Sequence, residues 1–255
     1  MAGHSKWDNI KHQKQKEDKR RAKLFSKLTK RITVAAREGG GDQEMNNDLR
    51  RAIQKAKDNN MPKDNIERAI KRGTGELEGV DYENFVYEGY GPGGVALYMD
   101  ILSDNRNRTA SELRHILSNN GGNLGESGCV AYMFEKKGRI MIDLSENEIG
   151  EEELLLQAIE IGAEDVLVNS GVATVYTTME ELEDVREELE NEGIEVDSAD
   201  LAMVPNNEVE VNDKSTAKKT LNLMEKLEDH EDIQEVYTNF DIPDNIMEEI
   251  QQEAG

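Results

Sequence analysis

Residues 139–203 read RIMIDLSENEIGEEELLLQAIEIGAEDVLVNSGVATVYTTMEELEDVREELENEGIEVDSADLAM, and their pattern decides the fold. Apolar runs of strand length alternate with stretches of helical period, and turn-forming residues separate them. The predicted strands span 139–144, 164–169, 172–177 and 194–203, and the predicted helices span 151–161 and 179–191. This β-α-β-β-α-β order is that of the ferredoxin-like fold.

Two incomplete units flank this stretch. Before it, the sequence predicts two strands, a helix and a strand, at 82–88, 95–104, 109–119 and 129–134. After a break at Pro205, it predicts a strand, a helix and a strand, at 208–211, 216–227 and 233–240. Neither set forms a stable domain easily by itself, so we expect one discontinuous α/β domain made of residues 79–136 and 205–240. Residues 137–204 are then an inserted ferredoxin-like domain, and 241–255 form a C-terminal helix.

Residues 1–78 are expected to form a helical domain. Apolar residues recur at spacings of three and four in three segments, which span 16–38, 44–59 and 62–72. Pro62 suits the first position of the third helix, and Gly73 suits the position just after it. The predicted fold class is α+β and multi-domain, with an N-terminal three-helix basic domain followed by two α/β domains, one of them ferredoxin-like.

Charge divides the chain at the end of the helical segment. Residues 1–72 hold 20 Lys and Arg against 10 Asp and Glu, a net charge of +10, whereas the remainder holds 11 against 44, a net charge of −33. The two parts together give the net charge of −23. A basic module on an acidic body indicates a polyanionic partner, because a local field of one sign speeds encounter with it.

One face of the first predicted helix carries only positive charge. Its members recur at helical spacing opposite the apolar face, and they are Lys16, Arg20, Lys23, Lys27, Lys30 and Arg37. We interpret this stripe as a phosphate-contacting surface. The alternative is an ordinary solvated helix face, although such faces usually mix signs.

Further candidate nucleic-acid contacts lie on both sides of this stripe. The segment before it supplies Lys6, Trp7, Lys11, His12 and Lys14. Trp7 either stacks on a base or packs this arm onto the helices. Arg106 and Arg108 open a predicted helix, whose N-terminus attracts anions. The alternative there is a helix cap with exposed arginines.

Patterns typical of an enzyme or a metalloprotein are missing from the sequence. The G-x-G-x-x-G match at 89–94 leads into a strand instead of a helix, so we interpret it as a hairpin connection. Cys129 lies in the apolar run CVAYMF and is expected to be a core thiol, and no Cys or His spacing suits zinc. We predict no enzymatic activity, no catalytic residues, no metal and no cofactor. The Gly-rich stretch 121–128 is either a mobile contact loop or a plain connector.

The bulk sequence points to a cytoplasmic protein without membrane contact. No window approaches 18 consecutive apolar residues, and the N-terminal residues lack the apolar region of a signal peptide. The single cysteine excludes an internal disulfide framework. The oligomeric state is left open.

Several long motifs resemble the YebC/PmpR family across essentially the whole chain. They are MAGHSKWDNIKHQK (1–14), TVAAREGGGD (33–42), NMPKDNIERAIKRGTGELEG (60–79), YEGYGPGGVA (87–96), DNRNRTASELRH (104–115) and GGNLGESGCVAYMFEKKG (121–138). The resemblance implies a helical domain, two α/β domains and a cytoplasmic, probable DNA-binding transcriptional regulator. Mitochondrial relatives are similar to translational activators, and some bacterial members to ribosome-associated factors.

The chain departs from the family pattern near its start. Asp8 stands where a small residue is usual, Gln13 replaces a basic residue, and Glu17 and Asp18 add negative charge. These changes weaken the case for phosphate binding by the arm and leave the stripe intact.

Three hypotheses about function follow. The first is a DNA-binding transcriptional regulator, in which lysines contact the DNA backbone and not the bases. The second is a translation factor that binds ribosomal RNA by shape and phosphates, with the acidic body facing ribosomal proteins. The third is a protein-interaction adaptor that has no nucleic-acid role.

Overall fold

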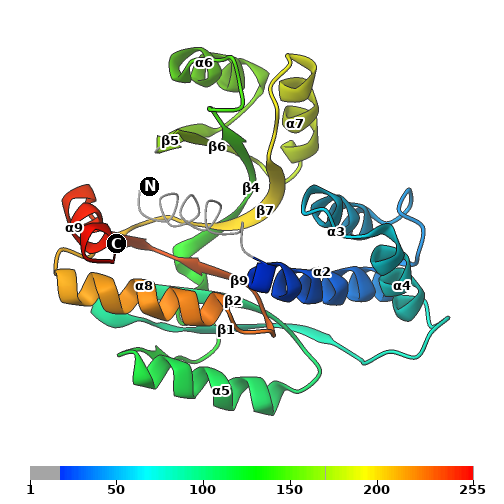
Figure 1. The fold of residues 1–255 in the computed structure, drawn as a ribbon, viewed down its shortest axis with the longest axis horizontal. Helices are drawn as coiled ribbons and strands as arrows, with labels where there is room; N and C mark the ends of the chain where they lie inside the picture. The colour runs from blue at the N-terminus through cyan, green and yellow to red at the C-terminus, as the bar shows by residue number, and fades with distance from the viewer. Residues whose placement is uncertain (1–17, 170, 255) are drawn as a thin grey trace.

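The computed structural model describes residues 18–169 and 171–254, with side chains described for 21–169 and 171–250. It confirms the predicted fold class, because an N-terminal helical region precedes two sheet-containing domains (Figure 1). Within these ranges, no helix has the length and apolar character needed to cross a bilayer.

The helical region consists of α2 (Asp18–Gly39), α3 (Asn47–Asp58) and α4 (Lys63–Gly73). Helix α2 packs against both of the others through its apolar face. Fully or nearly fully buried side chains form the shared core, among them Leu28, Ile32, Leu49, Ala56, Ile66 and Ala69. None of the three helices buries this face alone, which explains why they fold as a unit.

Both ends of α4 differ by one residue from the prediction. Pro62 precedes the helix as its N-cap, and Gly73 is the last helical residue instead of the residue after it. A left-handed φ of 81° occurs later, at Gly75. Gly73 is required for another reason: a Cβ atom there would lie 2.3 Å from the carbonyl oxygen of Thr33 in α2. The two helix backbones therefore approach too closely for any side chain.

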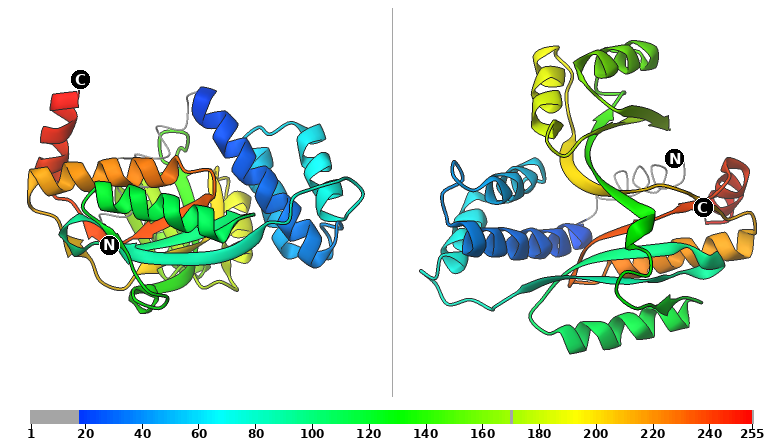
Figure 2. Two further views of the ribbon diagram at one scale, coloured as in Figure 1. Left: turned by 90° about the horizontal axis from the view of Figure 1, so that it is seen from below. Right: turned by 180° about the vertical axis from the view of Figure 1, so that it is seen from behind.

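The first large sheet has the strand order β3-β1-β2-β9 and is antiparallel throughout. Its strands are β1 (Glu83–Tyr90), β2 (Ala96–Ser103), β3 (Asn123–Leu124) and β9 (Ile233–Thr238). Helices α5 (Arg106–Asn119) and α8 (Lys214–Glu228) lie side by side and share one core with the sheet (Figure 2). The strand β9 reaches this sheet only after the chain has formed the second sheet.

The second large sheet has the order β5-β6-β4-β7 with antiparallel neighbours, which is the ferredoxin-like arrangement that the sequence predicted. Its elements are β4 (Phe134–Asp143), α6 (Glu151–Ile161), β5 (Asp165–Asn169), β6 (Val172–Thr177), α7 (Leu182–Asn191) and β7 (Ser198–Pro205). Both helices pack on one face of the sheet, where Ile140, Leu154 and Leu189 are fully buried.

Shorter elements complete the fold. A two-stranded parallel pair joins β8 (Val209–Glu210) to β10 (Phe240–Asp241), and α9 (Asp244–Ala254) follows. A small apolar cluster, which includes Tyr237 of β9, Phe134 of β4 and Ala202 of β7, joins the two large sheets. The relative position of the sheets is thus fixed partly by apolar packing.

The predicted buried strand at 129–134 is wrong. Cys129 is half-buried in a loop, a short 3-10 helix spans Ala131–Met133, and β4 begins only at Phe134. The reason lies in β1, where the buried carboxylate of Glu88 accepts the backbone N–H groups of Val130 and Ala131, at 2.7 and 2.8 Å. Amides bound to a side chain in this way are not available to a strand ladder.

We predict that Gly73→Ala lowers the free energy of unfolding by about 1–3 kcal/mol, because the new methyl group overpacks the contact between α4 and α2. Chemical denaturation monitored by circular dichroism measures the change. The matched control is Gly79→Ala, since Gly79 is exposed, lies outside any helix, and a Cβ there would meet its nearest atom only at 3.4 Å. Equal stability of the two variants would contradict the proposed close approach.

Candidate nucleic-acid interface

Three lysines of the basic stripe lie on the side of α2 that faces the end of α8 and the turn that follows it. Lys23 Nζ lies 3.1 Å from Asp229 Oδ2, and Lys27 Nζ donates to the Glu228 carbonyl oxygen at 2.7 Å. Lys30 Nζ donates to the Glu231 carbonyl oxygen at 3.1 Å and to Asp232 Oδ1 at 2.8 Å. The three lysines are spaced by four and three residues and so lie in line along one side of the helix.

The stretch 228–232, named here the acceptor turn, is electronegative for two reasons. Glu228 is the last residue of α8, and the final carbonyl groups of a helix lack intrahelical donors and carry partial negative charge. The carboxylates of Asp229 and Asp232 add formal charge. Backbone and side chains together present a row of oxygen atoms to the lysines.

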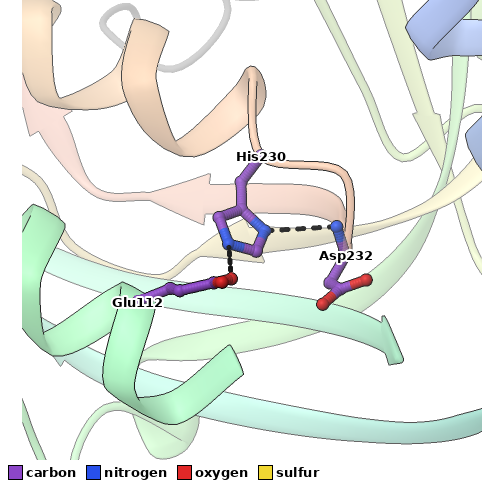
Figure 3. Close-up of side chains that lie close together, drawn as sticks. All are labelled: Glu112, His230 and Asp232. Carbon is purple, nitrogen blue, oxygen red and sulfur yellow. Dashed lines mark hydrogen bonds and ion pairs between the residues drawn. The ribbon is translucent and has the colours of Figure 1, made fainter. Parts of the chain in front are cut away.

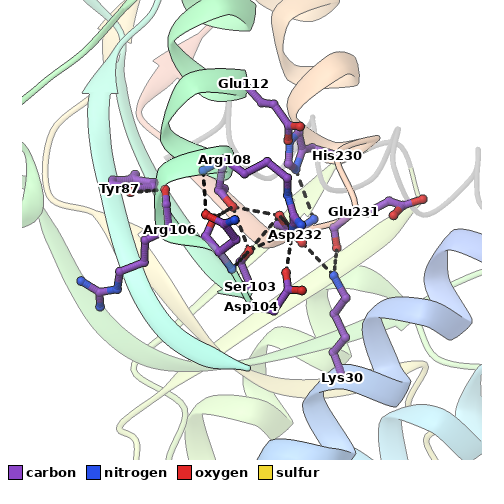
Figure 4. A network of polar contacts seen from close by, with 12 residues as sticks. Lys30, Tyr87, Ser103, Asp104, Arg106, Arg108, Glu112, His230, Glu231 and Asp232 are labelled. Carbon is purple, nitrogen blue, oxygen red and sulfur yellow. Dashed lines mark hydrogen bonds and ion pairs between the residues drawn. The ribbon is translucent and has the colours of Figure 1, made fainter. Parts of the chain in front are cut away.

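Asp232 is the most connected residue of this region (Figure 4). Its Oδ1 accepts from Lys30, and its Oδ2 accepts from Ser103 at 3.0 Å, Arg108 at 2.9 Å and Thr109 at 2.8 Å. The side chain is only 4% exposed. One carboxylate therefore connects α2, the end of β2, the first turns of α5 and the residue before β9.

The protonation of Asp232 follows from these contacts. Burial alone would raise the pKa of its carboxyl group, but hydrogen bonds from Lys30, Arg108 and Thr109 to the ionised form lower the pKa well below its usual range. Hydrogen bonds to Asp232 and Asp104 likewise raise the pKa of Arg108. Both groups stay charged at neutral pH.

The two arginines predicted at the start of α5 have partners within the chain. Asn105 caps the helix by accepting from the Arg108 backbone N–H at 3.0 Å. The Arg108 guanidinium donates to Asp104 at 2.8 Å as well as to Asp232. Arg106 pairs with Glu83 at 2.9 Å and stacks over the Phe85 ring, 4.3 Å from its centroid. The interpretation as a helix cap describes these contacts, and nucleic-acid contact by either arginine stays a prediction.

An open groove lies where α2, α5 and the acceptor turn meet. Its volume is about 1040 Å³, and its lining includes Ser26, Lys30, Arg108, His115 and His230 together with several carboxylates. The mixed charge of this lining does not select anions or cations by itself. The groove marks the boundary along which α2 meets the rest of the molecule.

Glu112, His230 and Asp232 line this groove and bring three potential metal ligands within 4.8 Å of one another (Figure 3). His230 Nδ1 accepts the Asp232 backbone N–H at 3.1 Å, so the ring proton is on Nε2, which donates to Glu112 Oε2 at 2.9 Å. A metal at Nε2 would require the other tautomer. Asp232 is also already bound by two cationic side chains, so the geometry suits a hydrogen-bonded cluster better than a metal site.

A second polar junction connects the helical region to both sheets, and sequence reasoning missed it. Lys55 Nζ of α3 lies 3.1 Å from Asp200 Oδ2 in β7 and 3.0 Å from Glu235 Oε1 in β9. Arg139 in β4 also pairs with Asp200, at 3.1 Å. Burial alone would raise the pKa of Asp200, but Arg139 and Lys55 lower it. No local sequence signal relates these residues, because they come from four separate elements.

The other predicted site residues are placed as follows. Arg37 donates to Asp81 Oδ1 at 3.2 Å and to the carbonyl oxygen of Tyr82, in the linker after α4. Arg20 lies in the first turn of α2, and its side chain is outside the described set. The remaining predicted contacts also lie outside the described residues: Lys6, Trp7, Lys11, His12, Lys14 and Lys16.

Comparison with known proteins identifies the family. The model of the TACO1/YebC protein N-terminal domain matches residues 5–76, and the model of the TACO1/YebC second and third domain matches residues 82–240. The chain belongs to the TACO1/YebC family. The resemblance seen in the sequence motifs is thereby confirmed.

Relatives of this TACO1/YebC protein are similar over their full length. A protein of Halothermothrix orenii is 70% identical over 99% of this chain and 100% of its own, and one of Natranaerobius thermophilus is 59% identical over 97% and 99%. Both are named probable transcriptional regulatory protein. The crystal structure of a conserved hypothetical protein from Aquifex aeolicus matches with a TM-score of 0.83 and 51% identity, over 89% of this chain and 93% of that one.

The Gly-rich loop of this TACO1/YebC chain is attached to β1. The Glu88 carboxylate accepts the Gly128 backbone N–H at 2.6 Å, and the Glu88 carbonyl oxygen accepts that of Gly125 at 2.8 Å. The stretch 121–128 is therefore a connector that hydrogen bonds to the buried Glu88 hold against β1. The alternatives left open by the sequence, a mobile contact loop or a plain connector, did not include this attachment. The preceding G-x-G-x-x-G segment joins the antiparallel strands β1 and β2, which confirms the predicted hairpin.

We predict that Asp232→Asn lowers the free energy of unfolding at pH 7 by about 2–4 kcal/mol, because charge-assisted hydrogen bonds are removed and two cations are left without a buried partner. The pKa of Asp232 is depressed in the native state, so its stabilisation is complete above its unfolded pKa of about 3.9 and is lost as the pH falls below it. Denaturant titrations from pH 7 to pH 2 should show a weaker pH dependence for the variant.

The matched control for this variant is Asp229→Asn. Asp229 is half exposed and pairs with a half-exposed lysine, so its removal should cost less than about 1 kcal/mol. Equal destabilisation of the two variants would show that Asp232 has no special structural role.

Proposed function

We propose that this protein is a nucleic-acid-binding regulator whose α2 stripe contacts the phosphate backbone, with DNA as the first candidate target. One observation carries the proposal. Lys23, Lys27 and Lys30 lie in line and each approaches an oxygen atom of the acceptor turn, at distances of 2.7–3.1 Å. Phosphate oxygens are acceptors of the same kind, and binding by such a row releases counterions.

Nucleic-acid binding of this kind exchanges the acceptors of the lysines, from oxygen atoms of the acceptor turn to phosphate oxygens. The acceptor turn occupies the three lysines in the free protein, so a nucleic acid has to replace it at the helix. The ion pair of Lys23 with Asp229 is half exposed and therefore weak, which suits replacement. Lys30 and Asp232 are 11% and 4% exposed and make the firmest contact. Exchange therefore starts at the Lys23 end of the stripe.

The proposal extends to the other candidate contact residues that the sequence singled out. These are Lys6, Trp7, Lys11, His12, Lys14, Lys16, Arg20, Arg37, Arg106 and Arg108. Most of them are backbone-contacting types that position a protein without reading sequence. Regulation of particular sites would then depend on DNA shape or on a further protein.

The names of the relatives support transcription over translation as the process involved. Crosslinking of the protein in cells, followed by sequencing of the bound nucleic acid, tests this choice. Recovery of promoter DNA is the expected result. Recovery of ribosomal RNA would overturn the DNA proposal in favour of a translation factor, and recovery of neither would leave a protein-interaction adaptor as the remaining hypothesis.

We predict that Lys23→Gln combined with Lys27→Gln weakens binding to a 20-base-pair duplex and lowers the salt dependence of the association constant by about two units of slope, roughly 0.9 for each phosphate that is no longer neutralised. Fluorescence anisotropy over a range of salt concentrations measures both quantities. Lys218→Gln combined with Lys219→Gln in α8 removes the same charge and is the control. Identical slopes for both double variants would rule out the stripe.

The exchange of acceptors also predicts a variant with higher duplex affinity. Asp229→Asn removes the negative charge that pairs with Lys23, so duplex affinity should rise by about 1.4- to 5-fold, the equivalent of a surface ion pair. Asp184→Asn in α7 removes the same formal charge away from the stripe and is the control in the same assay. A rise of equal size in both variants would indicate a general charge effect and not competition by the acceptor turn.

A further inference from the structure

Helix α6 carries apolar side chains on its outer face as well as its inner one. Leu154 and Ala158 are fully buried against the ferredoxin-like sheet. Leu155, Leu156 and Ile159 remain 43%, 64% and 48% exposed. Because Ile159 lies four residues after Leu155 and three after Leu156, it neighbours both on the helix surface, and the three form one patch, named here the α6 patch.

Such a face is unusual for a surface helix. A helix of a globular domain is normally apolar toward the core and polar toward water, whereas one that is apolar all round is normally buried. Figure 1 shows α6 at the end of the molecule opposite α5, well away from the helical region. Contiguous exposed apolar residues rimmed by polar ones mark interaction sites.

The surroundings of the patch have charge of one sign. Residues 137–204 hold three Lys and Arg against 20 Asp and Glu, a net charge of −17. Glu151, Glu152 and Glu153 form the first turn of α6, and Glu160 follows Ile159. The three cations of this stretch are already engaged in ion pairs within the chain, and they are Lys137, Arg139 and Arg186.

We propose that the α6 patch is a docking surface for a basic amphipathic segment of a partner protein. Aliphatic side chains at the centre and carboxylates at the rim match a segment with apolar residues on one side and Lys or Arg beside them. A second copy would bring another domain of charge −17 against the first, and a nucleic acid or an anionic membrane would be repelled in the same way. This surface is independent of nucleic-acid binding by α2.

The test uses the full-length protein and three fluorescent 14-residue peptides: an amphipathic Lys/Leu helix, a Glu/Leu helix of the same pattern, and a Lys/Ala helix with the charge but little apolar surface. Anisotropy is measured at 150 mM salt. The Lys/Leu peptide should bind, and Leu156→Ser combined with Ile159→Ser should raise its Kd at least tenfold. Glu152→Gln combined with Glu153→Gln should also weaken binding, with a smaller salt dependence.

Matched controls separate the patch from general stickiness. Met45→Ser and Tyr132→Ser remove other exposed apolar side chains, and neither should change the Kd. Unaltered thermal unfolding shows that the patch variants are folded. Equal affinity for the Lys/Ala peptide, unchanged affinity in the Leu156 and Ile159 variant, or binding of the Glu/Leu peptide would overturn the proposal. So would self-association in sedimentation that the patch variant abolishes, because a second copy would then be the occupant.

Discussion

The carboxylate of Asp232 is the constraint on which the arrangement of the molecule depends. A buried charge is costly unless it is paired and hydrogen-bonded, and here two cations and two hydroxyl groups satisfy it. Because those groups come from α2, β2 and α5, the residue before β9 can be buried only when all three elements are in place. Lys55 adds a second tie, from α3 to both sheets. The helical region is therefore positioned by polar contacts of high directionality, while each sheet keeps its own apolar core.

Most of the fold could be predicted from local sequence patterns. The helix at 151–161 and the strand at 172–177 were predicted to the residue, since their apolar spacing and turn residues act over a few positions. The prediction of a strand at 129–134 was wrong because the side chain of Glu88, which is distant in sequence, accepts the backbone N–H groups that a strand would use. The prediction that Gly73 follows the helix end was wrong by one residue, and the reason for a glycine there is the closeness of Thr33 in α2.

The lysines of the candidate site could be predicted from the sequence, but the groups that they contact in the fold could not. The spacing of Lys23, Lys27 and Lys30 is visible in the sequence, and so is their common charge. Their acceptors are not, because residues 201 to 206 positions further along the chain supply them. Separations of 124 and 145 positions likewise hide the contact of Arg108 with Asp232 and that of Lys55 with Asp200. The charge asymmetry of the sequence thus indicated a polyanionic partner. In the structure, the electronegative acceptor turn of the same chain already contacts part of the basic stripe.

The late position of β9 has a consequence for synthesis. Translation proceeds from the N-terminus, and domains generally fold as their residues emerge. The helices α2 to α4 and the ferredoxin-like sheet have all their own strands and helices before residue 206, whereas the first sheet and the acceptor turn wait for residues 228–238. On a nascent chain the lysine stripe is consequently uncovered while most of the protein already exists, and it meets its intramolecular acceptors only near the end of translation.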